Sequence, residues 1–280
     1  MLSDLLGRRL ILKAVKAIPH GFFMELDGEE FFLPGKLAPK VFQVGDEAEL
    51  FLYRDSEDRL TGTTEIPLAM VGDIRRLRVK DSASQGYYLD WGLSKDLLLP
   101  KSQIKFPIEV GQRDLVLVYF DEKGQNLAAT TLFDEHLHRA DEHIVEGQLV
   151  EVTALRSLDI GLAVGINGEY LGMVYQEDIQ EPINPGEQRQ AWIKKIRPDG
   201  KIDVTLRNPS FKKVLDEASQ KLLVALESAH GSLPLHDKSP PEEIRSRLGM
   251  SKKDFKRAAG VLYRERLIKI TDQGLTKSEN

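Results

Sequence analysis

The feature that most constrains the fold of this chain is an internal repeat, because one pattern of short strands occurs three times before residue 210. Each copy has three β-rich runs, the second beside a glycine. A Val-Gly or Pro-Gly turn, a long β-rich run and a last short strand follow. Five alternating strands in about 65 residues, separated by Gly and Asp turns, are typical of a small barrel. We therefore predict three tandem five-stranded barrels.

The repeat and the change of pattern after it divide the chain into four predicted domains. They are the barrels at 1–66, 67–140 and 141–209, and a different module at 210–280. The predicted strands of the first copy are 10–18, 20–26, 31–34, 48–53 and 59–64. Those of the second are 74–79, 85–91, 96–100, 115–120 and 126–132. Those of the third are 149–155, 160–164, 170–175, 191–196 and 201–206.

The module at 210–280 has helical periodicity. Apolar residues at 3–4 spacing predict an amphipathic helix over 211–228. A second helix is predicted from the proline-rich start at 239–242, with Ser239 and Glu242 forming a capping box. A third is predicted to begin at Ser251, which together with Asp254 would cap it. The runs 267–271 and 275–276 predict a hairpin. This order predicts a winged helix-turn-helix, so the whole chain is expected to be mainly β with a C-terminal α+β module.

The third predicted helix has a basic face. Lys253, Arg257 and Arg264 recur opposite its apolar residues. They are candidates for nucleic-acid contacts, since this fold often places its third helix against DNA, and the alternative is a solvated face. Gly260 lies in the middle of this helix, where Gly costs about 1 kcal/mol relative to Ala. We therefore expect it to permit the close approach of a neighbouring helix or a ligand.

The charge distribution sets this module apart. The chain has a net charge of −5, but residues 210–280 carry 14 Lys and Arg against 10 Asp and Glu, a net +4. Such asymmetry favours an anionic partner for the module. Zero cysteines exclude disulfides, thiolate zinc sites, iron–sulfur clusters and cysteine nucleophiles. No apolar run reaches the roughly 20 residues of a membrane span, and no signal peptide is recognisable, so we expect a cytoplasmic protein without a membrane partner.

Catalytic signatures are missing from the sequence. There is no P-loop, no G-x-S-x-G and no H-E-x-x-H motif. His136, His138 and His143 lie near Asp134 and Asp141 and could hold a metal ion, but a polar linker helix between two barrels is favoured. We expect no enzyme activity, no catalytic residues, no cofactor and no metal.

The barrels resemble the S1-type OB-fold, an RNA-binding barrel, whose core pattern is Gly-x-aromatic-apolar on the second strand and Asp-x-x-Gly-Lys/Arg before the fifth. The resemblance implies that RNA lies across strands two and three. It contacts an aromatic residue before the glycine, another two places after it, a His ending strand three, and an Asp and an Arg at the last turn. The first copy has, in that order, His20, Phe23, Leu33, Asp55 and Arg59. The second has Gln85, Tyr88, Leu99, Asp121 and Gln125. The third has Ile160, Ala163, Tyr175, Arg197 and Lys201.

No copy matches the S1 pattern fully, so some barrels are expected to be spacers. In the first, Phe22 should face the core and Phe23 the surface, because neighbours on a strand point to opposite faces. An aromatic residue on a strand can equally be a packing residue. In the third copy, Trp192 and Lys194 share one side of a strand, and either stack on RNA or pack against a neighbouring barrel. We expect this barrel, with its many cations, and the winged helix to hold most of the affinity.

The order of the whole chain, with its most specific part at residues 239–268, resembles the bacterial conserved virulence factor B family. This resemblance implies a protein that binds single-stranded RNA and affects gene expression after transcription. The alternative is a regulator of transcription whose winged helix reads duplex DNA. The sequence has no pattern that fixes an oligomeric state. The predicted RNA-binding residues are Phe23, Arg59, Tyr88, Tyr175, Trp192, Lys194, Arg197, Lys201, Lys253, Arg257 and Arg264.

Overall fold

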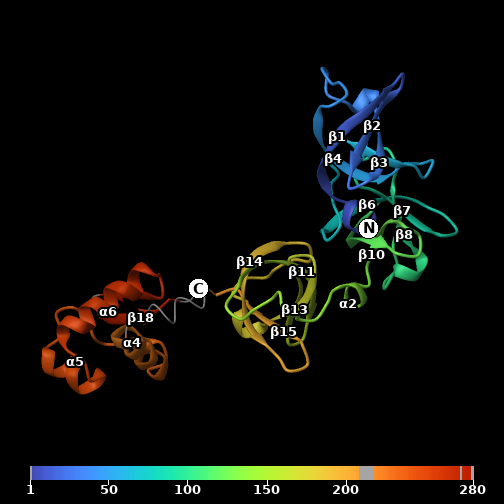
Figure 1. The fold of residues 1–280 in the computed structure, drawn as a ribbon. Coiled ribbons are helices and arrows are strands. Elements are labelled where there is room, and N and C mark those ends of the chain that lie inside the picture. Colours follow the sequence, from blue (N-terminus) through green and yellow to red (C-terminus); the bar gives the residue numbers. More distant parts are fainter. Residues whose placement is uncertain (1, 208–216, 272, 279–280) are drawn as a thin grey trace. The chain divides into compact units, whose positions relative to one another are not determined.

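The computed structural model describes residues 2–207, 217–271 and 273–278. The chain forms two compact units, Met1–Leu206 and Arg207–Asn280. The first unit contains three closed barrels of five strands, and the second contains helices and a three-stranded sheet (Figure 1). The predicted mainly β architecture of three barrels and a C-terminal α+β module is confirmed. The exact domain boundaries stay predictions.

The three barrels share one topology. The first strand of each pairs antiparallel with the second and the fourth, and the third and fifth strands run parallel. Barrel 1 consists of β1 (Arg9–Ile18), β2 (Gly21–Leu26), β3 (Glu29–Pro34), β4 (Glu47–Arg54) and β5 (Leu60–Thr63). Barrel 2 consists of β6 (Ile74–Ser82), β7 (Gly86–Asp90), β8 (Leu97–Pro100), β9 (Arg113–Asp121) and β10 (Asn126–Thr130). Barrel 3 consists of β11 (Leu149–Leu158), β12 (Gly161–Ile166), β13 (Tyr170–Tyr175), β14 (Gln188–Ile196) and β15 (Ile202–Thr205).

The repeated glycine at the start of the second strand has a steric cause. A Cβ atom at Gly21, Gly86 or Gly161 would lie 2.1 Å from a carbonyl oxygen of the third strand. No side chain fits at that separation, so the hairpin between strands two and three can close only at glycine. The residues that follow this glycine, which are aromatic in barrels 1 and 2, are thereby held at the same place in every barrel.

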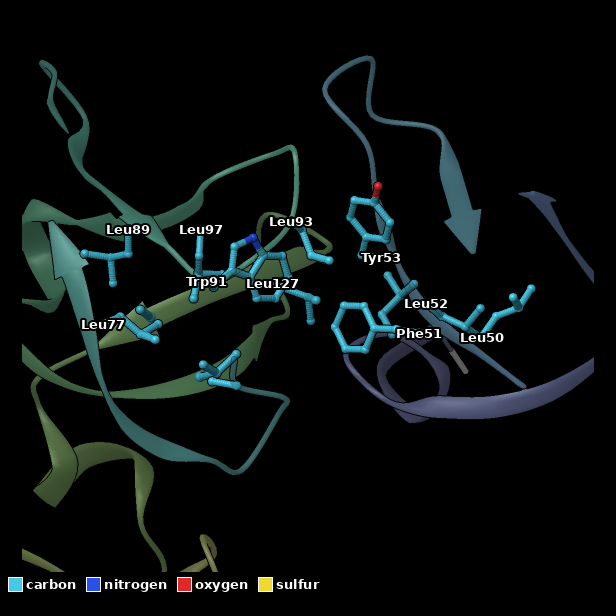
Figure 2. Close-up of a cluster of buried hydrophobic side chains, with 14 of the residues drawn as sticks. Leu50, Phe51, Leu52, Tyr53, Leu77, Leu89, Trp91, Leu93, Leu97 and Leu127 are labelled. Carbon is cyan, nitrogen blue, oxygen red and sulfur yellow. The ribbon is translucent and has the colours of Figure 1, made fainter. Parts of the chain in front are cut away.

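Barrels 1 and 2 share one apolar core, which begins at the N-terminal turn α1 (Leu2–Leu5). Strand β4 is buried on both faces, since Leu50 and Leu52 alternate with Phe51 and Tyr53. The rings of Phe51 and Tyr53 lie 5.6 and 6.5 Å from that of Trp91, measured between centroids, and point toward it from the other barrel (Figure 2). Phe51 and Trp91 are 0% and 2% exposed. The two barrels are therefore one packed body.

The segment between barrels 2 and 3 forms the single-turn helix α2 (Phe133–His136). Phe133 and Leu137 are buried in a small apolar cluster with residues of both barrels. Asp134 on the same turn accepts hydrogen bonds from Lys105 and Arg156, at 2.8 Å each. Burial alone would raise the pKa of Asp134, but these two hydrogen bonds outweigh it and lower that pKa. The predicted polar linker is wrong for the inner side of this segment, which packs as apolar core.

The second unit has the predicted winged-helix order. Its core is formed by the apolar faces of the helices and the sheet. The elements are α4 (Glu217–Ser228), β16 (Ser232–Leu233), α5 (Pro241–Leu248), α6 (Lys252–Arg264), β17 (Ile268–Thr271) and β18 (Gly274–Lys277). The first part of the predicted helix over 211–228 lies outside the described residues. No helix among the described residues is long and apolar enough to span a membrane.

Two predicted helix caps have different outcomes. The hydroxyl of Ser251 accepts a hydrogen bond from the Asp254 amide at 3.1 Å, so the predicted cap of α6 is confirmed. Ser239 does not cap α5, because its hydroxyl accepts from the His236 amide instead, and Pro240 occupies the cap position. The predicted capping box is therefore wrong, while the predicted proline at the first helical position is correct.

Candidate nucleic-acid interface

The outer face of strands β2 and β3 in barrel 1 carries two neighbouring aromatic rings. Phe23 pairs with Phe32 in the strand register, and their ring centroids are 6.0 Å apart. Phe22 points the other way, packs against the core and meets Phe42 edge-on at 5.0 Å. The adjacent residues Phe22 and Phe23 thus lie on opposite faces, as the strand pattern predicts, although both are half-buried.

Two cations flank this aromatic pair. The Lys16 ammonium lies 5.8 Å from the ring centroid of Phe23, and the Arg59 guanidinium lies 5.8 Å from that of Phe32. Both separations are within cation–π range. We name these four residues, Lys16, Phe23, Phe32 and Arg59, the barrel 1 platform. It offers flat apolar surface between two positive charges.

Two carboxylates hold the arginine of the barrel 1 platform, since Arg59 also forms an ion pair with Glu57 at 2.8 Å. Asp55 accepts from Nε and Nη2 of Arg59, at 2.9 and 2.7 Å, a bidentate arrangement that orients the guanidinium. The hydrogen bond to Asp55 raises the pKa of Arg59. Burial raises the pKa of Asp55, but its hydrogen bonds from Arg59 have the larger combined effect, and the net shift is downward. The pair therefore stays ionised, and Arg59 is held beside Phe32.

Barrel 2 has a reduced version of this surface. Tyr88 occupies the place of Phe23, and its neighbour in the register is Leu98, where barrel 1 has Phe32. The hydroxyl of Tyr88 accepts a hydrogen bond from the Gln85 side chain. Gln125 holds the place of Arg59, so this face has one aromatic ring and lacks the equivalent cation.

In barrel 3 the corresponding face is covered. Ala163 holds the place of Phe23, is 3% exposed, and belongs to the apolar cluster shared with barrel 2. Two residues further on, a Cβ atom at Gly165 would lie 2.3 Å from the Cδ1 atom of Ile74 in barrel 2. Barrel 2 thus occupies the surface of β12 on which the S1 pattern would place RNA.

The position assigned to Tyr175 from the sequence is wrong by one residue. Tyr175 pairs with Gly161, just as Pro34 pairs with Gly21 and Pro100 with Gly86. It therefore corresponds to the prolines that follow the expected His position. Its ring lies 5.7 Å from the guanidinium carbon of Arg197, which also donates to its hydroxyl.

The cations predicted in barrel 3 are paired with carboxylates. Lys194 lies 2.8 Å from Asp178 and 3.0 Å from Glu177. Arg197 and Lys201 form equivalent pairs with Asp203, at 3.0 Å, and with Asp199, at 3.2 Å. Trp192 is half-buried on the outer face of β14, in register with Leu149 and Thr205. The local positive charge of this barrel is therefore largely compensated.

The predicted basic residues of the winged helix lie on the exposed face of α6. Lys253, Arg257 and Arg264 are all exposed, and Arg257 has an ion pair with Asp254 at 3.3 Å. The buried face consists of Phe255, Ala258, Ala259 and Leu262, as predicted. Gly260 does not face a neighbouring helix, since no described atom lies within 4 Å of a Cβ built there. That part of the expectation is wrong.

Sequence reasoning missed Phe32 and Lys16 of the barrel 1 platform. Phe32 alternates with the buried Phe31 and Leu33, so strand periodicity alone marks it as outward. Its contact with Phe23 follows only from the hairpin register. Among the described residues, no group of three His, Asp or Glu side chains is arranged to hold a metal ion. The His136 ring instead lies 2.8 Å from the Gln103 side chain and 4.2 Å, between centroids, from the Tyr119 ring.

Comparisons with known proteins agree with this domain order. The S1 domain model matches residues 6–65 and 71–132, and the model described as CvfB-like winged helix domain matches residues 220–276. The protein YitL of Bacillus subtilis is 26% identical over 268 residues, which are 92% of this chain and 89% of that protein. Conserved virulence factor B of Staphylococcus epidermidis RP62A is 26% identical over 243 residues, 84% of this chain and 81% of the relative.

One solved structure, of a multidomain protein with nucleic acid binding domains from Streptococcus pneumoniae TIGR4, covers 98% of this chain and 99% of its own, with 22% identity and a TM-score of 0.41. The matched domain models define a tandem S1-domain protein with a C-terminal winged helix, and both domain types are nucleic-acid-binding rather than enzymatic. The relatives and the winged-helix match add the closer assignment. The C-terminal domain is a CvfB-like winged helix, and the chain as a whole is similar to conserved virulence factor B proteins.

Proposed function

We propose that this protein binds single-stranded RNA, with the barrel 1 platform as its main base-stacking surface, and affects gene expression after transcription. The observation that carries the proposal is the outward pair Phe23 and Phe32 between Lys16 and Arg59. An aromatic ring on a sheet stacks on an unpaired base for about 1–3 kcal/mol, and a cation beside it attracts the phosphate. A duplex hides its base faces and gains little from such a surface.

The geometry supports barrel 1 over barrel 3 as the main RNA contact. The sequence led us to expect most of the affinity in barrel 3 and the winged helix. In barrel 3, however, Ala163 stands in the place of Phe23 and is buried against barrel 2. In this proposal barrel 3 is mainly a spacer, while the exposed cations of α6 supply a second contact.

The alternative function is duplex DNA binding by the winged helix in a regulator of transcription. It is favoured by the exposed basic face of α6, because this fold commonly places such a helix in the major groove. In this alternative the barrels would hold partners or effectors. The barrel 1 platform would then have no role in nucleic-acid binding.

Binding to two ligands of equal charge separates the two functions. We expect the full chain to bind a labelled single-stranded RNA more tightly than a duplex DNA of equal phosphate number, in fluorescence anisotropy titrations at two salt concentrations. Electrostatic contacts make both affinities fall with salt, whereas stacking should leave the RNA preference in place at the higher salt. Tighter binding of the duplex at both salt concentrations would favour the DNA regulator.

Replacement of one ring tests the barrel 1 platform directly. Phe23→Ala should weaken RNA binding about 5- to 100-fold, the equivalent of losing one stacked base, and leave the melting temperature nearly unchanged. Phe22→Ala is the matched control, because it removes the same ring from the inner face of the strand. That control should lower stability, by less than the roughly 3–5 kcal/mol of a fully buried Phe, and retain RNA affinity. Normal RNA binding by Phe23→Ala would exclude the platform as the site.

A further inference from the structure

Gly260 forms a gap in the middle of the exposed basic face of α6. On a helix the nearest surface neighbours of a residue are three and four positions away on either side. For Gly260 these are Lys256, Arg257, Tyr263 and Arg264, all of which are exposed. Three of the four are cations, and Tyr263 is 56% exposed. The gap therefore has backbone as its floor, three positive side chains and one aromatic ring around it. We call this feature the α6 notch.

No contact among the described residues of the second unit explains a glycine here. Gly260 lies well inside α6, and it is not among the glycines with positive φ. A Cβ atom would meet open space within the described part of the chain. Alanine at this position would thus satisfy the local structure better than glycine. A glycine that is unfavourable for the helix, with no described residue packed on it, is consistent with close approach of a ligand.

We propose that the α6 notch holds one phosphate of a single-stranded RNA, with the adjacent base stacked on Tyr263. A phosphodiester group is small and anionic, and it would be surrounded by Lys256, Arg257 and Arg264. Arg257 keeps its ion pair with Asp254 and adds its positive charge to this surface. The absent side chain lets the phosphate reach the helix surface between these cations.

Tyr263 selects a single strand over a duplex in this arrangement. In a duplex the bases are paired and stacked, so a base cannot swing onto a ring beside its own phosphate without being unpaired. In a single strand the base is free to stack on an exposed aromatic side chain. This inference rests on the proposed RNA-binding function and adds a second, separate contact to the barrel 1 platform.

Substitutions that fill the notch test the proposal, and the affinity of the full chain for a labelled single-stranded RNA is measured for each of them. Gly260→Leu should weaken RNA binding about tenfold or more, since its side chain occupies the place of the phosphate, and Gly260→Ala should weaken it a few-fold. Gly260→Ala should also raise the melting temperature of the second unit, by about 4 °C or more, because Ala is the better helix former. Higher stability with lower affinity is a combination that a structural role cannot produce.

Ser246→Leu is the matched control, because Ser246 is a small, exposed residue inside the neighbouring helix α5. It adds a side chain of comparable size and should leave RNA affinity unchanged. Tyr263→Ala should weaken binding of single-stranded RNA about 5- to 100-fold and leave duplex DNA binding unaffected.

Three results would overturn the notch. The first is equal RNA affinity of Gly260→Leu and Ser246→Leu. The second is normal RNA binding by Tyr263→Ala. The third is a loss of duplex DNA binding in Gly260→Leu and Tyr263→Ala that is as large as their loss of RNA binding. If Phe23→Ala still weakens RNA binding in the same titrations, the proposed function stands and only the notch fails. If the unmodified chain does not bind RNA, the proposed function itself fails.

Discussion

Phe51→Ala should lower the free energy of unfolding of the first unit by about 3–5 kcal/mol. Phe51 is fully buried, and its ring lies against Tyr53 of its own strand and Trp91 of the other barrel. Truncation leaves a cavity between two barrels, and the surrounding side chains can fill it only in part. Urea titration of the full chain, followed by tryptophan fluorescence, measures the loss, because Trp91 is in the altered cluster.

Phe106→Ala is the control for this truncation. It deletes the same ring from a position that is 63% exposed, so it should cost little stability. If Phe51→Ala costs no more than Phe106→Ala, the two barrels do not share the core described above. A loss confined to one of two resolved transitions would mean that the barrels unfold separately.

Gly168→Ala should destabilise the contact of barrels 2 and 3 by about 2–5 kcal/mol. Gly168 has φ +74°, and a Cβ atom there would lie 2.0 Å from the carbonyl oxygen of Gly72 in barrel 2. The left-handed backbone costs a residue with a side chain about 1–2 kcal/mol, and overpacking adds about 1–3 kcal/mol. Thermal melting of the full chain should show the first unit unfolding earlier.

Gly147→Ala separates the two causes. Gly147 has a similar φ of +85°, but apart from its chain neighbours no described atom lies within 4 Å of its Cβ position. It should therefore show the backbone cost alone. Equal losses in Gly147→Ala and Gly168→Ala would mean that the close approach of the two barrels contributes nothing.

Most of the fold could be predicted from the sequence because its signals are local. The alternation in β1, the continuous apolar run of β4 and the glycine before Phe22 define strands within a few neighbouring residues. Ser251 and Asp254 mark the start of α6 for the same reason. The predicted strands and helices consequently fall within a few residues of those in the structure.

The candidate site was predicted less completely, because its decisive features depend on contacts between distant residues. Ala163 reads as a lost aromatic residue in the sequence, and only the packing of Ile74 from barrel 2 shows that its surface is covered. The pairing of Phe32 with Phe23 requires the hairpin register. Tyr175 ends a continuous β-rich run, in which a one-residue shift leaves no trace in the sequence. Each of these errors concerns which residues are in contact, or which partner a residue has in the strand register.

The shared core of the first two barrels sets the distance between their outer faces. Since Phe51, Tyr53 and Trp91 lock the barrels together, Phe23 and Tyr88 are held at a constant separation before any ligand arrives. If the protein binds RNA as proposed, an RNA too short to span both rings contacts only one of them. A longer strand meets the second ring at a high effective concentration, without the entropic cost of ordering a flexible linker. The affinity would thus depend on the length of the ligand, because the apolar packing fixes the distance between the two rings.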